Sequence, residues 1–242
     1  MAKMPGALWQ GEHSPKVEMD RYDVVCVHTI VGYAPAHAAH FSVKADGTIL
    51  QSRDTRYRSA ANLNGNHRVI AIENEDHGPR FGGTPTLPEW VPLTLEQVEA
   101  NGRILAWAHQ THDIPLELCP NSRAMSRGLA YHRQGIDGDF SRYRFPGRVS
   151  GGELWSGSRG KVCPTDVRIA QLPEILAHAR ALVNKEEEGI MALTDADAEK
   201  LVEAFMRYKP KGQELAVEQL LKQAANAPSV VRQEHRRDRA EE

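Results

Sequence analysis

The segment 22-YDVVCVHTIVG-32 decides the predicted fold. Its unbroken run of apolar, mostly β-branched residues, closed by Gly32, is typical of a buried strand. Because side chains alternate along a strand, Val24, Cys26 and His28 share one face, with His28 near the end of the strand. An imidazole in that place needs a polar partner or a position at a cleft. His28 is therefore either a hydrogen-bonded core histidine or part of a functional site.

Further strands and a helix are predicted downstream. Residues 40–51 contain two β-prone runs around an Asp-Gly pair, which is a strong hairpin signal. Residues 68–76 predict a third strand, and Glu73 lies near its polar end. A carboxylate there is costly unless it is paired, ligated or catalytic, although a glutamate at a loop edge is the simpler interpretation. Thr94 is expected to cap a helix over 95–112.

The rest of the main body also alternates between predicted strands and helices. Residues 113–120 predict a short strand, 122–147 a loop-rich segment, and 165–188 a second helix. Alternating strands and helices indicate an α/β domain, which we place at residues 1–185.

Residues 186–242 form a separate region, which starts with an acidic run and continues as two short predicted helices and a charged tail. Two short helices bury little alone, so they are expected to pack on the main domain, on a partner or on a copy of themselves. The face for self-association carries Leu201, Ala204 and Phe205. A solvated linker with a frayed tail is the alternative. A further hypothesis is a second product that starts at Met191, since Lys-Glu-Glu codons can spell a purine-rich ribosome-binding sequence just upstream.

Composition excludes several classes of protein. The 242 residues carry a formal net charge of −2, with no basic segment in the main body and no Gly-rich phosphate loop, so nucleic-acid binding is not expected. Three cysteines without dense spacing argue against a disulfide framework. No stretch approaches the roughly 20 apolar residues of a membrane span. Because the N-terminus lacks a secretory signal pattern, we expect a soluble protein made in the cytoplasm.

Histidine and cysteine are the candidate metal ligands. Two histidine pairs stand at helical spacing: His37 with His40, and His109 with His112. An exposed or capping histidine is the commoner interpretation of such pairs. In 160-GKVCPTD-166, Lys161 favours the thiolate form of Cys163, and the proline stiffens the loop. A thiolate favours zinc, and a buried structural cysteine is the alternative.

Five stretches, in order, resemble one protein family: VHTIVG (27–32), AHFSVKADGTILQ (39–51), AANLNGNHRVIAIENED (60–76), YHRQGIDGD (131–139) and GKVCPTD (160–166). The family is that of the zinc-dependent N-acetylmuramoyl-L-alanine amidases related to peptidoglycan-recognition proteins, in particular the actinobacterial phage endolysins. The resemblance spans about residues 5–180. It implies a central mixed β-sheet flanked by helices. The small helical region over 186–242 lies outside the resemblance, and cell-wall binding or self-association is the role expected for it.

The resemblance assigns roles to five residues. It implies that His28, His132 and Cys163 are the zinc ligands. Glu73 falls on the general acid and base of one branch of the family. Lys161 falls on the lysine that lies near the scissile carbonyl.

Four positions depart from the family pattern. Ala39 stands where a second branch has a catalytic tyrosine, and this leaves the glutamate as the proton-transfer group that matches. Thr29 stands where the family has a second histidine, which does not affect the ligand position before it. Ala71 replaces a glycine, and 60-AANLNGN-66 lacks the histidine that the family has there, so substrate contacts in that segment are not implied.

The resemblance also implies the reaction, which is hydrolysis of the amide between the lactyl group of N-acetylmuramic acid and L-alanine of the stem peptide. The expected partner is peptidoglycan and the expected cofactor is Zn²⁺. The expected setting is a phage endolysin that reaches the wall from the host cytoplasm after holin-type release. Two alternatives remain: a cytoplasmic amidase that recycles muropeptides, and a module that binds peptidoglycan without cutting it. Such modules typically lack a zinc ligand, whereas this chain keeps all three.

Overall fold

The computed structural model describes residues 2–12, 16–30, 34–76 and 91–191. The chain divides into two compact units, Met1–Glu187 and Glu188–Glu242, and the fold below is that of the first. The predicted C-terminal helices and their self-association face lie outside the described residues. Within the described ranges, no helix is both long and apolar enough to cross a membrane.

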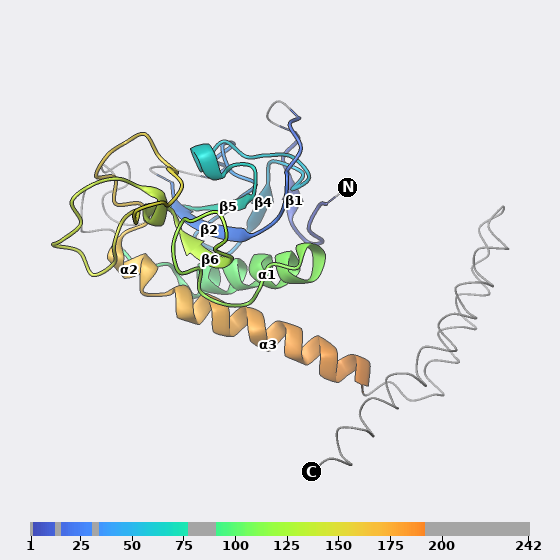
Figure 1. Cartoon of the computed structure of the whole chain (residues 1–242). Helices are drawn as coiled ribbons and strands as arrows, with labels where there is room; N and C mark the ends of the chain where they lie inside the picture. The colour runs from blue at the N-terminus through green and yellow to red at the C-terminus, as the bar shows by residue number, and fades with distance from the viewer. Residues whose placement is uncertain (1, 13–15, 31–33, 77–90, 192–242) are drawn as a thin grey trace, which may run out of the picture. The chain divides into compact units, whose positions relative to one another are not determined.

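A six-stranded mixed sheet forms the centre of the fold (Figure 1). Its strands are β1 (Leu8–Trp9), β2 (Val24–Thr29), β3 (Phe41–Val43), β4 (Ile49–Gln51), β5 (Val69–Asn74) and β6 (Gly128–Tyr131). The spatial order is β1-β4-β3-β5-β2-β6, in which β3 and β4 pair antiparallel and the other neighbours pair parallel. The expected α/β fold with a central mixed sheet is confirmed.

The segment 22–32 forms the strand that it predicts. All six residues of β2 are buried, because β5 and β6 flank it on both sides. The expected hairpin is also present as β3 and β4. Its turn needs glycine at position 47, where φ is +78° and an added Cβ would lie 2.8 Å from the carbonyl oxygen of Glu96.

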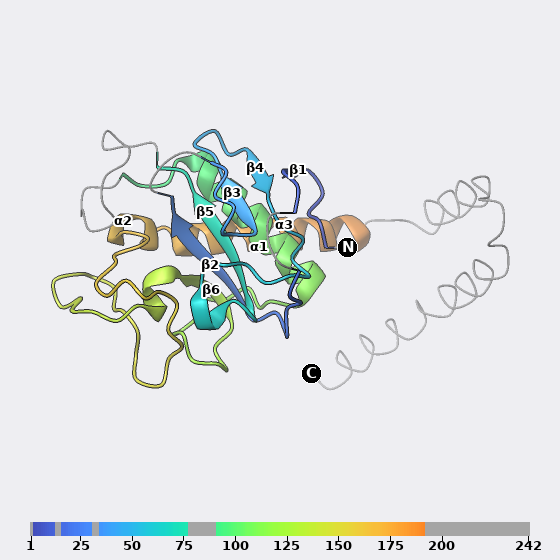
Figure 2. The ribbon, with the colours of Figure 1, turned by 90° about the horizontal axis from the view of Figure 1, so that it is seen from above.

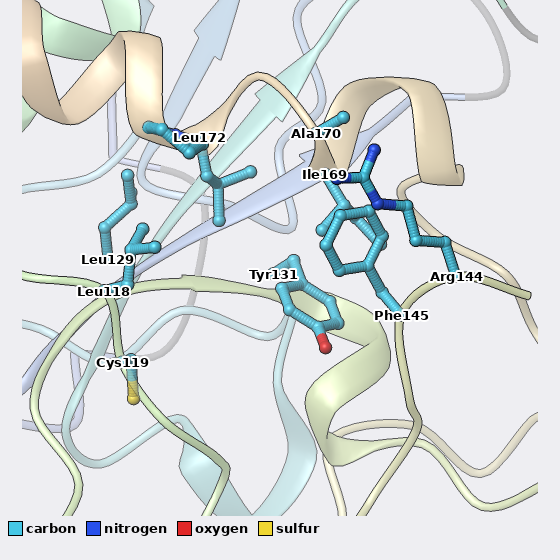
Figure 3. Close-up of a pocket in the computed structure, with 10 residues that line it drawn as sticks. Leu118, Cys119, Leu129, Tyr131, Arg144, Phe145, Ile169, Ala170 and Leu172 are labelled. Atoms are coloured by element: carbon cyan, nitrogen blue, oxygen red, sulfur yellow. The ribbon is translucent and has the colours of Figure 1, made fainter.

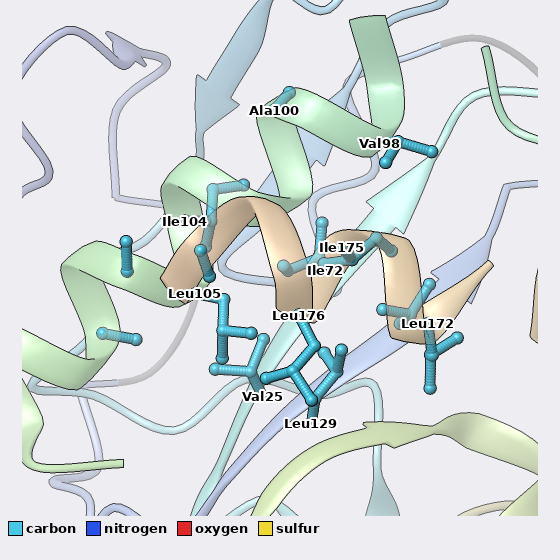
Figure 4. Packing of buried hydrophobic residues seen from close by; sticks show 14 of the residues in the cluster. Val25, Ile72, Val98, Ala100, Ile104, Leu105, Leu129, Leu172, Ile175 and Leu176 are labelled. Atoms are coloured by element: carbon cyan, nitrogen blue, oxygen red, sulfur yellow. The ribbon is translucent and has the colours of Figure 1, made fainter. Parts of the chain in front are cut away.

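Two helices cover one face of the sheet (Figures 2 and 4). Helix α1 (Leu95–His112) has the predicted bounds, and Thr94 caps it in a capping box with Gln97. Helix α3 (Leu172–Met191) packs beside it. Figure 4 shows Leu105 of α1 and Leu176 of α3 above Val25 of β2, so the apolar sides of both helices meet the sheet in one core.

The prediction of one continuous helix over 165–188 was wrong. A short helix, α2 (Asp166–Ile169), comes first, and α3 begins after a break. Pro173 explains the break, because its ring cannot donate a backbone hydrogen bond and would clash with the carbonyl of Ile169 in a continuous helix.

The predicted strand over 113–120 was also wrong. In that segment only Leu118 forms an isolated bridge, and its partner is Leu129. The sixth strand is β6, which lies inside the segment predicted as loop-rich. Its four residues are too few to show a period in the sequence.

Alternation along the central strands separates a core face from a second face. Val25, Val27, Ile70 and Ile72 point into the helix-covered core. Val24, Cys26 and Val69 belong to a smaller apolar cluster that also contains Trp155. On that second face, polar residues replace apolar ones toward the carboxyl ends of β2 and β5. The carboxyl ends of parallel strands are where α/β proteins commonly place ligands.

Candidate active site

Three neighbouring parallel strands carry candidate residues to one place. Strands β5, β2 and β6 run in the same direction, so their carboxyl ends lie at one edge of the sheet. His28 in β2 stands in register with Glu73 in β5. His132 follows β6 directly, as the first residue of a 3₁₀ helix over His132–Gly135. The pairing that builds the sheet therefore also assembles these three side chains.

Cys163 joins them from the loop before α2. Its Sγ accepts a hydrogen bond from the backbone N of Thr29 at 3.3 Å, which ties the loop to the end of β2. One ligand atom each of His28, His132 and Cys163 lies within 4.8 Å of the others, and all three residues are buried. The described part of the chain contains no other such group of three histidine, cysteine or acidic residues.

A hydrogen bond fixes how His132 faces this group. Its Nε2 lies 3.0 Å from the carbonyl oxygen of Trp155. A carbonyl only accepts, so Nε2 carries the proton and Nδ1 carries a lone pair. That Nδ1 is buried without a hydrogen-bond partner. An unpartnered imidazole nitrogen beside a second imidazole and a thiol is a donor set suited to zinc, so the residues present fit this ion.

His28 is held in a similar way. Its Nε2 lies 3.2 Å from Oδ1 of Asn62, and its Nδ1 lies 3.8 Å from Oε1 of Glu73. The two imidazole rings are 4.1 Å apart between centroids. Each ring thus has one nitrogen bound to an oxygen on its outer side, which leaves the other nitrogen for the centre of the site.

Burial favours the uncharged form of every ligand in the metal-free site. It lowers the pKa of His28 well below its ordinary value and that of His132 to about 3, and in both cases neighbouring positive charge adds to the effect. Burial also raises the pKa of the Cys163 thiol to about 12, which the Lys161 charge partly opposes. The imidazoles are therefore ready to bind a metal ion, whereas the thiol must first lose its proton.

Glu73 and Lys161 complete the site. Burial raises the pKa of Glu73 to about 7, and the Lys161 ammonium opposes the rise. Oε2 of Glu73 is buried without a hydrogen-bond partner. Lys161 also acts electrostatically on both histidines and on Cys163, so its charge lies close to all four groups. The five predicted site residues are thus brought together.

The other histidine pairs have structural contacts instead. His40 is fully buried, its Nε2 lies 2.8 Å from the carbonyl oxygen of Tyr57, and its Nδ1 accepts a hydrogen bond from the backbone N of Ala71. Nδ1 of His109 lies 2.9 Å from the carbonyl oxygen of Ile114. His109 and His112 lie in the last turn of α1, as a capping role predicts, whereas His40 is a hydrogen-bonded core histidine and not the exposed or capping residue that was expected.

Sequence reasoning missed two residues that contact the histidines, Asn62 and Trp155. Asn62 lies in a segment that we considered only for substrate contacts, and Trp155 acts through its backbone carbonyl. A backbone carbonyl leaves no signal in the sequence, whereas a buried asparagine in a turn gives a weak one.

A separate pocket of about 210 Å³ lies near β6 and the junction of α2 with α3 (Figure 3). Figure 3 shows Tyr131, Phe145 and Ile169 around it, with Arg144 beside them. Its lining is mainly apolar and does not include the five site residues. Tyr131 faces this pocket and the next residue, His132, faces the site, so the two lie on different sides of the chain at that point.

Comparison with known families places the chain in one of them. The sequence model of the N-acetylmuramoyl-L-alanine amidase family (Amidase_2) matches residues 8–144. The chain belongs to this family. The matched part contains His28, Glu73 and His132. In this amidase-family chain, Lys161 and Cys163 come after the matched part. No curated protein matches the chain significantly.

Several solved structures are similar to the chain. The N-acetylmuramoyl-L-alanine amidase LysC from Clostridium intestinale URNW has 14% identity and a TM-score of 0.47, covering 72% of this chain and 97% of that one. The Staphylococcus aureus hydrolase AmiA has 16% identity and a TM-score of 0.47, covering 73% and 84%. Drosophila PGRP-LB has 12% identity and a TM-score of 0.43, covering 69% and 92%.

Proposed function

We propose that the chain is a zinc-dependent N-acetylmuramoyl-L-alanine amidase that cuts the amide between N-acetylmuramic acid and L-alanine of the peptidoglycan stem. The observation that carries the proposal is the buried group of His28, His132 and Cys163, whose ligand atoms lie within 4.8 Å of one another beside Glu73. These three residues would hold the zinc ion. Zinc there would supply a Lewis acid that polarises an amide carbonyl and lowers the pKa of water toward about 7.

Glu73 would carry the proton in this reaction. Its carboxylate would take a proton from the attacking water and deliver it to the leaving nitrogen, so that a C–O bond forms, the C–N bond breaks, and L-alanine leaves as a free amine. A pKa of about 7 suits both steps, because both protonation states are present near neutral pH. Such proton transfer typically contributes about 10²–10⁴-fold to the rate.

Lys161 would stabilise the negative charge that develops on the carbonyl oxygen. Its positive charge acts on Glu73 and on the three candidate ligands, which supports a role for it at this site. A fixed positive charge in a partly buried site stabilises an oxyanion more than it would in water.

The biological setting that we propose is a phage endolysin of the actinobacterial type. Its support is the ordered set of sequence motifs, which resembles that group over most of residues 1–185. In this proposal residues 1–185 form the catalytic domain, and residues 186–242 serve wall binding or self-association. The enzyme would be made in the host cytoplasm and would reach peptidoglycan after holin-type release.

The test is digestion of purified peptidoglycan by wild-type protein and by Cys163→Ala, Glu73→Gln and Cys119→Ala variants. Mass spectrometry would detect stem peptides with a free L-alanine amine, and elemental analysis would measure bound zinc. We expect wild type to release the peptides, Cys163→Ala to lose zinc and activity, and Glu73→Gln to lose activity alone. Cys119→Ala is the matched control, because this second buried cysteine is outside the ligand group.

Two outcomes would contradict the proposal. Binding to intact wall without peptide release would indicate a recognition module. Release from soluble muropeptides but not from intact sacculi would keep the amidase chemistry and would refute the endolysin role.

A further inference from the structure

Asn62 lies beside the candidate metal site, in contact with His28. It is fully buried, and its side-chain amide bridges two residues that point to the same face of β2. Oδ1 lies 3.2 Å from Nε2 of His28, and Nδ2 donates to Sγ of Cys26 at 3.4 Å. The amide therefore spans one pleat of the strand and has a partner at each end.

We propose that Asn62 is a positioning residue that holds His28 as its Nε2–H tautomer, so that the Nδ1 lone pair faces the metal ion. The inference rests on the proposed zinc function. An amide oxygen only accepts, so its approach to Nε2 requires the imidazole proton to sit there. The opposite flip of the amide would place an NH₂ group against Nε2 and would move the imidazole proton to Nδ1, into the centre of the site.

The backbone around Asn62 is built to hold the amide in place. Its own N donates to Oδ1 of Asn66 at 2.7 Å, which closes a short turn. The next residue, Leu63, has φ of +37°, a region that residues other than glycine rarely adopt. Such a conformation is strained and persists only where the surroundings enforce it. The turn therefore keeps a strained backbone while it presents Asn62 to His28.

The same turn packs against the residue that holds the other histidine. An added Cβ at Gly65 would lie 2.5 Å from Nε1 of the Trp155 indole, and one at Gly135 would lie 2.2 Å from its Cγ. Trp155 is thus fitted closely against two glycines, and its carbonyl oxygen binds His132. The outer hydrogen-bond partners of both histidines belong to one tightly packed unit, which fixes the two rings relative to each other.

An amide also suits the charge of the site. A carboxylate at position 62 would add a buried negative charge next to His28, which itself lies beside Glu73 and in the ligand group with Cys163. Neutral asparagine orients His28 without that charge. Asn62→Asp is an informative variant, because it keeps an oxygen acceptor for the Nε2–H of His28 and adds the negative charge that asparagine lacks.

Two measurements test the role, on wild type and on Asn62→Leu, Asn62→Asp and Asn64→Leu variants. The first is the tautomer of His28 in metal-free protein, from the ¹⁵N shifts of its ring nitrogens. The second is the zinc dissociation constant, from competition with a chromophoric chelator. Asn64 is the matched control, because it is an exposed asparagine in the same turn.

We expect wild type, Asn62→Asp and Asn64→Leu to show the Nε2–H tautomer. Asn62→Leu should lose this preference and should bind zinc about 10–100-fold more weakly, the usual effect of removing such an outer partner. Zinc binding by Asn62→Asp should stay far tighter than by Asn62→Leu. If Asn62→Leu does not fold, the wild-type tautomer and the Asn62→Asp variant carry the test.

A wild-type His28 in the Nδ1–H form would overturn the proposal. Equal zinc affinity in Asn62→Leu and Asn64→Leu would also overturn it. If wild type takes up no zinc, the proposed function itself fails, and the positioning role fails with it even where the hydrogen bond is intact.

Discussion

Replacing Glu73 by glutamine in metal-free protein is expected to change how stability depends on pH. Burial raises the pKa of Glu73 to about 7 from an ordinary value of 4.5, and this value already includes the opposing effect of Lys161. In the unfolded chain the carboxyl ionises near the ordinary value. Between these two values the folded protein keeps a proton that the unfolded chain has lost. The protonated carboxyl of Glu73 therefore contributes fully to the stability of the folded protein below about pH 4.5, and this contribution is lost as pH rises through about 7.

The size of the effect follows from the shift. Each unit of pKa difference corresponds to 1.36 kcal/mol, so the ionised carboxyl costs the folded protein about 3 kcal/mol above about pH 8. The Glu73→Gln variant has no group that ionises there and escapes this loss. The free energy of unfolding of the variant, minus that of wild type, should therefore rise by about 3 kcal/mol between about pH 4.5 and about pH 8.

Urea unfolding followed by tryptophan fluorescence, with a chelator present, measures this difference at several pH values. Glu117→Gln is the control for the substitution itself, because Glu117 is an exposed glutamate outside the site. A flat or falling difference for Glu73→Gln would refute the reasoning, since it would mean that burial does not disfavour the charged form of this carboxyl.

Three further results are expected. Zinc uptake at about pH 8.5 should release at least one proton, because the Cys163 thiol must ionise whereas both histidines are already neutral. Water bound to the zinc ion would release a second proton, since its pKa lies at about 7. Calorimetry in buffers of different ionisation enthalpy counts the protons, and a count near zero would contradict the thiolate ligand. Gly135→Ala should destabilise the fold by about 1–3 kcal/mol and weaken zinc binding, because the new methyl group meets Trp155. Gly157→Ala is the control, because a methyl group there has open space and should change neither property. Unfolding and chelator titrations measure the two effects. Lys161→Gln should lower kcat by about 10²–10³-fold with zinc retained, and an unchanged kcat would exclude its role at the carbonyl oxygen.

The central part of the fold could be predicted because local patterns and tertiary structure agree there. Residues 22–32 read as a buried strand, and β2 is buried because strands flank it on both sides. The helix over 95–112 was predicted to the residue, since Thr94 gives a clear start signal. Strand β6 was not predicted, because its four residues are too short for a periodic pattern and acquire their conformation by pairing with β2.

The residues of the candidate site also fall into two groups, those that local sequence patterns could single out and those that they could not. His28 and Glu73 could be singled out as polar residues at the ends of apolar strands, and the sheet register then places them side by side. His132 and Cys163 carried little signal alone and were recognised through the family resemblance. The contact from Trp155 to His132 could not be predicted, because it depends on a backbone carbonyl that the fold brings from a distant loop.

The register of the sheet links the site to the core. Along β2 and β5, residues that face the helices alternate with residues that face the site, as with Val27 beside His28 and Ile72 beside Glu73. A slip of one residue would turn the carboxylate of Glu73 into the apolar core and Ile72 into the site. Burial of Val27 and Ile72 under the helices therefore also enforces the pairing of His28 with Glu73.

The metal-free site is well suited to fold before any metal ion arrives. A buried group of charges would oppose folding, but here burial keeps His28 and His132 neutral and Cys163 protonated, and Glu73 is only partly ionised near pH 7. The sheet and its outer hydrogen bonds can thus form around uncharged ligands. In the proposed zinc enzyme, metal uptake would exchange the thiol proton for a cation, so the charge of the Cys163 thiolate would appear only when its counter-charge is present.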